Sequence, residues 1–190
     1  GPEPESEYRV PNESMIDLTH TMNCIMCGAC VSDCTVLEVD KSFTAPAALA
    51  KAYRFAGDPR DGHTHDRLVK LSEAGGIWDC TRCMYCNERC PKGVNPRDAI
   101  EKLGGIAFQE GRSMHDAGAR HAKAFLISMR TGGKLNETVL VPFTKPIGAM
   151  FDVPFAIQMA RHGKAPSPIP HKIKKLDEVK SLIKNVKETI

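Results

Sequence analysis

This 190-residue sequence has no large excess of one charge, no long apolar run and no apolar N-terminus, and each of these absences argues against a class of protein. The 26 basic residues nearly balance the 23 acidic ones, which argues against a basic nucleic-acid arm and against an acidic tail. No apolar run approaches the roughly 18 uncharged residues of a membrane span, so we expect no transmembrane segment. The first ten residues, GPEPESEYRV, are acidic and Pro-rich rather than apolar. They do not resemble a secretory signal, and we expect a cytoplasmic protein.

The patterns of common catalytic and nucleotide sites are also missing. The seven histidines form no H-E-x-x-H or similar metal motif, and no Gly-rich run follows a strand as in a Rossmann or P-loop site. No serine has a recognisable base near it, and strand signals are scarce throughout. We therefore expect an all-α protein that contributes no catalytic residue of its own and binds no nucleic acid.

What the sequence does contain is eight cysteines in two runs with the same spacing, C-x2-C-x2-C-x3-C. The first run is Cys24, Cys27, Cys30 and Cys34, and the second is Cys80, Cys83, Cys86 and Cys90. Each cysteine of the second run lies 56 residues after its counterpart, so the pattern is an internal repeat. Disulfide frameworks belong to small secreted chains, and zinc sites use separated C-x2-C pairs. This spacing is the bacterial ferredoxin run, and it predicts two [4Fe–4S] clusters.

The spacing also predicts how the ligands are shared. Thiolates at i, i+3 and i+6 can wrap one cubane, whereas the fourth cysteine leaves the loop and in two-cluster proteins binds the other cluster. We therefore expect two crossed ligand sets: Cys24, Cys27, Cys30 and Cys90 for the first cluster, and Cys80, Cys83, Cys86 and Cys34 for the second. The second run ends in Cys90-Pro91, as in ferredoxins, whereas the first ends in Cys34-Thr35, which leaves only the local turn of that loop in doubt.

Residues between the ligands are candidates for tuning the clusters. Gly28 allows the backbone to approach closely, and Arg82 and Arg89 are cations able to raise the potential of the second cluster. Ordinary loop packing and solvated charge explain these residues equally well.

The residues around the runs predict helices. Pro46 suits a first helical turn, and the apolar stretch after it, interrupted only by Lys51 and Arg54, ends at Gly57. Thr64 is a candidate cap for a helix that extends through Ala74. Asn95, as a cap before Pro96, predicts a third helix to about residue 110.

The C-terminal half has a different pattern. Ser113–Asp116 resembles a capping box for a helix to about Thr131, and prolines divide residues 139–159 so that they cannot form one span. Apolar residues recur at helical spacing from Ile173 to Ile190, with Val186 among them. We expect the following segments: a flexible tail (1–14), a cluster domain (15–111), a partner-docking helical extension (112–165), and a linker with an amphipathic helix (166–190).

Two segments carry a family resemblance. The stretches PAALAKAYRFAGDPRD and GIWDCTRCMYCNERCPKGVNPRDAI resemble the α-helical ferredoxin domain, which occurs in the iron–sulfur subunits of succinate dehydrogenase, fumarate reductase and heterodisulfide reductase. The resemblance covers about residues 15–110. The dehydrogenase subunits add an N-terminal [2Fe–2S] domain and lack one cysteine of the second run. Here only 23 residues precede Cys24, and Cys83 is present, so the likeness to the two-cubane subunit of heterodisulfide reductase is greater.

That resemblance implies an electron-transfer subunit of a hetero-oligomeric oxidoreductase. Its two clusters would relay single electrons from a flavin subunit to a cysteine-rich catalytic subunit, or in the reverse direction, in disulfide or sulfur metabolism. The version from sulfur-oxidising bacteria is weakly favoured over the methanogenic one. Two alternatives stay open: a quinone-linked subunit of the succinate dehydrogenase or fumarate reductase type, and a structural zinc module that acts as an interaction scaffold.

Overall fold

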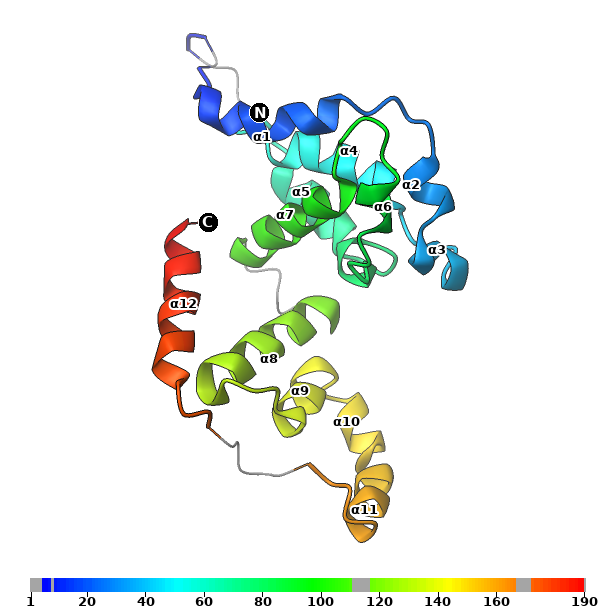
Figure 1. Cartoon of the computed structure of the whole chain (residues 1–190), viewed down its shortest axis with the longest axis vertical. Coiled ribbons are helices and arrows are strands. Elements are labelled where there is room, and N and C mark those ends of the chain that lie inside the picture. Colours follow the sequence, from blue (N-terminus) through cyan, green and yellow to red (C-terminus); the bar gives the residue numbers. More distant parts are fainter. Residues whose placement is uncertain (1–4, 8, 111–116, 167–171, 190) are drawn as a thin grey trace. The chain divides into compact units, whose positions relative to one another are not determined.

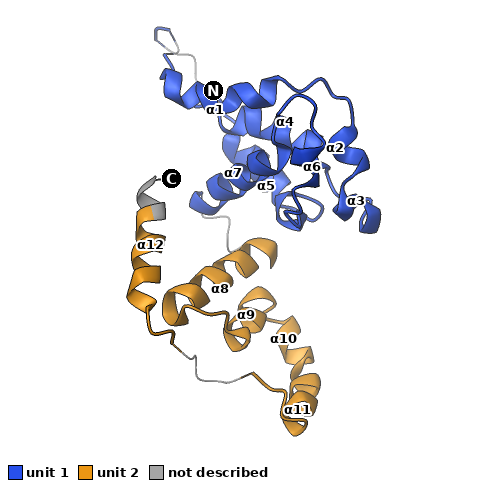
Figure 2. Ribbon diagram, in the orientation of Figure 1, with its two compact units in different colours: residues 1–112 blue, residues 113–190 orange. Residues whose placement is uncertain are grey.

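The computed structural model describes residues 5–7, 9–110, 117–166 and 172–189. The chain divides into two compact units, Gly1–Arg112 and Ser113–Ile190 (Figure 2). In all described residues the regular elements are helical and none is a strand (Figure 1), which confirms the all-α prediction. Across these same ranges, no helix is both long enough and apolar enough to cross a bilayer.

Unit 1 is built around two helices that pack side by side, α4 and α7. Its elements are α1 (Asn12–Met22), α2 (Ala29–Ser32), α3 (Thr35–Val39), α4 (Pro46–Ala56), α5 (Thr64–Leu71), the 3₁₀ turn η1 (Ile77–Asp79), α6 (Tyr85–Glu88) and α7 (Pro96–Gln109). Leu49 of α4 and Leu103 of α7 are fully buried, with Leu18 and Leu68 in the same core. Burial of each such side chain stabilises the fold by about 1.5–3 kcal/mol.

The predicted helix starts are confirmed for α4 and α7, and Asn95 occupies the predicted cap position of α7, but the predicted cap at Thr64 is wrong. Asn95 precedes α7 in the left-handed region, at φ 52°, and its side chain makes no capping bond. Thr64 is the first residue of α5 rather than its cap, and its hydroxyl donates to the carbonyl oxygens of Ala56 and Asp61. The same helix ends at Leu71, earlier than predicted, because the chain turns at Ser72 toward the Gly-Gly pair.

The residue before α4 is strained. Ala45 has φ 76° and ψ 151°, a region that is nearly exclusive to glycine. We expect Ala45→Gly to raise the free energy of unfolding by about 1 kcal/mol, because it relieves this strain. Ala52→Gly, the same change in the interior of α4, should lower it by about 1 kcal/mol. Urea unfolding of the cluster-loaded protein measures both, and a loss of stability in Ala45→Gly would contradict the prediction.

Unit 2 is also helical. Its elements are α8 (Ala117–Gly132), α9 (Glu137–Thr144), α10 (Gly148–Phe151), α11 (Val153–Arg161) and α12 (Leu176–Thr189). The break-up of residues 139–159 into separate helices confirms that they form no continuous span, although Pro142 lies inside α9 rather than ending it. Helix α12 begins after Ile173, whose N–H donates to the Gly132 oxygen.

Some sequence predictions for unit 2 lie outside the described residues. They are the capping box at Ser113–Asp116 and the side chains of Val186 and Ile190. Within the described residues, Phe151, Phe155, Ile147 and Met150 of the α9–α11 region are exposed rather than buried in a core.

Candidate metal centre

The two cysteine runs form the same backbone structure twice. Each run bends through two residues in the left-handed region: Met26 (φ 56°) and Gly28 (φ 79°) in the first, and Arg82 (φ 58°) and Met84 (φ 71°) in the second. A short helix follows each bend, α2 after the first and α6 after the second. These positions differ by the 56 residues that separate the cysteines, so the sequence repeat is also a structural repeat.

The two repeats contact each other through their short helices. Helices α2 and α6 pack together. Asp33 and Arg89, which occupy equivalent positions in the two runs, form an ion pair with 2.5 Å between Oδ2 and Nε. The charge of Arg89 is thus partnered by a carboxylate, which weakens its predicted role as a cation that raises the potential of one cluster.

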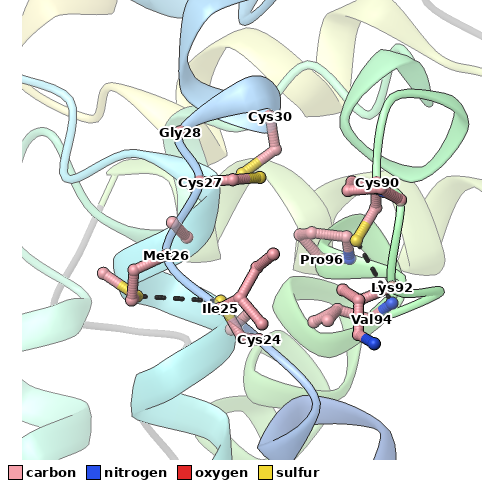
Figure 3. A pocket seen from close by; sticks show the side chains of 13 residues that line it. Cys24, Ile25, Met26, Cys27, Gly28, Cys30, Cys90, Lys92, Val94 and Pro96 are labelled. Carbon is pink, nitrogen blue, oxygen red and sulfur yellow. Dashed lines mark hydrogen bonds between the residues drawn. The ribbon is translucent and has the colours of Figure 1, made fainter.

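Four cysteines line one pocket of unit 1. The side chains of Cys24, Cys27 and Cys30 come from the first run, and Cys90 comes from the end of the second. In Figure 3, Cys90 lies across the pocket from the loop that carries Cys27 and Cys30. The Val94 N–H donates to Cys90 Sγ over 3.3 Å. Backbone N–H donors of this kind stabilise the negative charge of ligating sulfur.

The end of the first run lies near the second run. The hydroxyl of Thr35, which directly follows Cys34, donates to Cys83 Sγ over 3.5 Å. Cys34 and Cys86 are buried, with relative exposures of 6% and 7%.

Three thiols of this region are poorly suited to free thiolate chemistry. Burial raises the pKa of Cys30, and its neighbours Cys24, Cys90 and Cys27 raise it further. Burial likewise raises the pKa of Cys80, and it raises the pKa of Cys86 to about 11. Such thiols stay protonated at neutral pH unless a cation replaces the proton, which is what metal binding does.

The donor set fits a polynuclear cluster. A cubane presents four separate irons, each bound by one thiolate, so its ligands surround the cluster from different sides. Thiols from a tight loop and from a distant segment, as around the pocket of Cys24 and Cys90, suit that geometry.

Sequence reasoning missed some polar residues beside the cysteines. Lys51 Nζ donates to the Cys24 carbonyl oxygen over 3.4 Å, and Asn87 Oδ1 accepts from the Arg97 N–H over 2.8 Å. The available signal for Lys51 was its position as a polar break in an apolar helix. Asn87 carried none, because its partner lies ten residues away on α7.

The region is similar to known proteins. Residues 20–94 match the family described as "4Fe-4S dicluster domain". A relative from Wolinella succinogenes, named 8-methylmenaquinol:fumarate reductase iron-sulfur subunit, is 35% identical over 146 residues, which are 75% of this chain and 44% of that protein.

For two further relatives, the match covers a smaller share of the relative's own length. A protein of Methanothermobacter marburgensis, named as one subunit of fumarate reductase (CoM/CoB), is 36% identical over 68% of this chain and 25% of its own. The succinate dehydrogenase iron-sulfur subunit of Paracoccus denitrificans is 35% identical over 54% of this chain and 40% of its own. The chain therefore spans less than half the length of these relatives.

Proposed function

We propose that this chain, whose residues 20–94 match the family described as "4Fe-4S dicluster domain", is the iron–sulfur subunit of a fumarate reductase- or succinate dehydrogenase-type complex. It would pass single electrons between a flavin-bearing partner and a quinone-linked one. The relatives favour this alternative over the heterodisulfide reductase assignment that the sequence favoured, because all three relatives described above carry fumarate reductase or succinate dehydrogenase in their names.

The observation that carries the proposal is the convergence of thiols from both runs on one pocket. Cys90 joins Cys24, Cys27 and Cys30 there, and the electrostatic neighbours of Cys80 include Cys34. Both observations support the crossed ligand sets. When bound, [4Fe–4S] clusters supply reversible one-electron transfer.

The residues of the chain have structural tasks in that transfer. Ala47, Val94 and Pro96 give the pocket of Cys24 an apolar lining, which lowers the local polarity around a bound cluster. The Val94 N–H and the Lys51 ammonium supply positive character at Cys90 and Cys24. The pairing of α2 with α6 holds the two runs against each other. In the crossed arrangement that we propose, neither ligand set would be complete without the other run.

Partner subunits are part of the proposal. The relatives are named as subunits of larger enzymes, which supports a hetero-oligomeric complex. Exposed apolar side chains on α10 and α11, including Phe151 and Phe155, would suit the partner-docking role predicted for residues 112–165. The cytoplasmic location predicted from the sequence stays a prediction.

A second candidate rests on a specific residue. Cys83 is present, whereas the dehydrogenase subunits that the sequence resembles lack one cysteine of this run. One relative is also named for CoM/CoB rather than for a quinone. Both points support a heterodisulfide reductase-like complex, in which the partners are a flavin subunit and a cysteine-rich catalytic one. Purification of the native complex separates the candidates, because the first requires a membrane-anchored quinone-linked partner and the second requires soluble cysteine-rich subunits.

The cofactor prediction is tested without any partner. We expect anaerobically purified protein to be brown and to contain about eight irons per chain, since two cubanes hold four irons each. Metal analysis and visible absorbance measure this directly. A colourless protein with about two zincs per chain would support the structural zinc module and would contradict the proposal.

A further inference from the structure

The two repeats differ in their hydrogen-bond donors at the residue that follows the fourth cysteine. The second run is followed by Pro91, which has neither an N–H nor a hydroxyl. The equivalent residue after the first run is Thr35, which has both. Because the fourth cysteine of each run leaves toward the other run's ligands, Thr35 is carried toward the second run.

Thr35 contacts a cysteine of that run directly. Its hydroxyl Oγ1 lies 3.5 Å from Cys83 Sγ and donates to it across 48 residues of sequence. The hydroxyl of Thr81 lies 3.4 Å from that of Thr35, so the two form a polar pair beside the sulfur. At the position equivalent to Thr81, the first run has the apolar Ile25.

Cys83 differs from Cys90 in the kind of donor that its sulfur accepts from. Cys83 accepts from a side-chain hydroxyl, whereas Cys90 accepts from the backbone N–H of Val94. The Thr35 backbone N–H is a second donor toward Cys83. This N–H is free to donate because Thr35 is the first residue of α3, where an N–H has no acceptor within the helix.

We propose that Thr35 is a positioning residue that raises the reduction potential of the cluster held by Cys83, by donating a hydrogen bond to the Cys83 sulfur. The inference rests on the proposed function, since it requires that Cys83 binds a cluster. Reduction adds one negative charge to a cluster and its thiolates, and a donor to sulfur stabilises the reduced state more than the oxidised one. The position equivalent to Thr35 in the other repeat is Pro91, which has no hydroxyl, so this donor acts on the second cluster alone.

Three substitutions at position 35 separate the hydroxyl from the N–H. Thr35→Val removes the hydroxyl and keeps the branched shape, and Thr35→Ser keeps the hydroxyl. Thr35→Pro removes both donors, and the backbone accepts it, because position 35 begins a helix and Cys34 before it is extended at ψ 112°. Thr19→Val is the control, because the Thr19 hydroxyl donates only to the Ile16 oxygen on α1.

The experiment is a redox titration of the anaerobically purified chain, followed by electron paramagnetic resonance. The signal of the second cluster is identified as the one that Cys83→Ser changes. We expect Thr35→Val to lower the midpoint potential of the second cluster by about 59 mV. For one electron, this corresponds to a tenfold change in the equilibrium constant for reduction. Thr35→Pro should lower the potential further, and Thr35→Ser should restore it. The potential of the first cluster should stay unchanged in all of these variants. In the control Thr19→Val, the potentials of both clusters should stay unchanged.

The possible failures are distinguishable. If the potential of each cluster is the same in the wild type, in Thr35→Val and in Thr35→Pro, the role of Thr35 is overturned. The proposed function then stands. A wild-type chain without cluster signals would overturn the proposed function itself. If Thr35→Val fails to load, the Thr81→Val variant, which removes the second hydroxyl of the pair, must lower the same potential, and an unchanged value would refute the inference.

Discussion

Replacing Cys90 with serine is expected to remove the cluster that Cys24, Cys27 and Cys30 would hold, although Cys90 belongs to the other run. The four residues line one pocket, and Cys90 supplies the side opposite the loop of the first run (Figure 3). Loss of one of four thiolate ligands leaves an iron without its anionic donor. We expect iron to fall from about eight to about four per chain, as measured by metal analysis after anaerobic purification.

Cys34→Ser is the matched variant. Cys34 is buried beside the second run, and we expect its loss to remove the cluster of Cys80, Cys83 and Cys86 and to spare the first. If each serine instead removed the cluster of its own run, the crossed ligand sets would be wrong. The redox signal altered by Cys83→Ser identifies which cluster survives in each variant.

The second large effect is expected in the core of unit 1. Leu103 of α7 is fully buried in the core that α4 and α7 share. Leu103→Ala should lower the free energy of unfolding by about 2–5 kcal/mol, because it removes buried methyl groups and leaves a cavity. Urea unfolding of the cluster-loaded protein measures the change.

Val39→Ala is the control for that measurement. Val39 ends α3 and is 89% exposed, so its truncation removes almost no buried surface. We expect a change within about 0.5 kcal/mol. Equal losses in Leu103→Ala and Val39→Ala would mean that the contact between α4 and α7 is not the core that stabilises unit 1.

The parts of the fold that the sequence predicts best are those that depend on local chemistry. Pro46 and Pro96 begin helices because their fixed φ and missing N–H suit the first turn, and both helices are present. The cysteine spacing is equally local within each run, and the two runs share one backbone structure. Residues 139–159 are also divided into separate helices, with Pro146 between α9 and α10 and Pro154 at the start of α11, although Pro142 lies inside α9.

The parts that the sequence could not predict depend on contacts between distant residues. Met84 adopts the left-handed conformation that its counterpart Gly28 adopts easily, although methionine has no preference for it. Tertiary structure imposes that conformation, because the second run must repeat the bend of the first. The contact of Thr35 with Cys83 spans 48 residues, and the sequence shows only that proline is absent there. Asn95 is a typical capping residue, but it has a positive φ and its side chain makes no capping bond.

The most direct test of two clusters with shared ligands is the iron content of paired double variants. Cys24→Ser/Cys90→Ser removes two ligands of one predicted cluster, so the chain should keep about four irons, while Cys24→Ser/Cys34→Ser removes one ligand from each and should leave almost none. The reverse result, with iron kept only when Cys24 and Cys34 are both replaced, would contradict the crossed arrangement. Loss of all iron in both double variants would show that the two sites do not assemble as separate clusters.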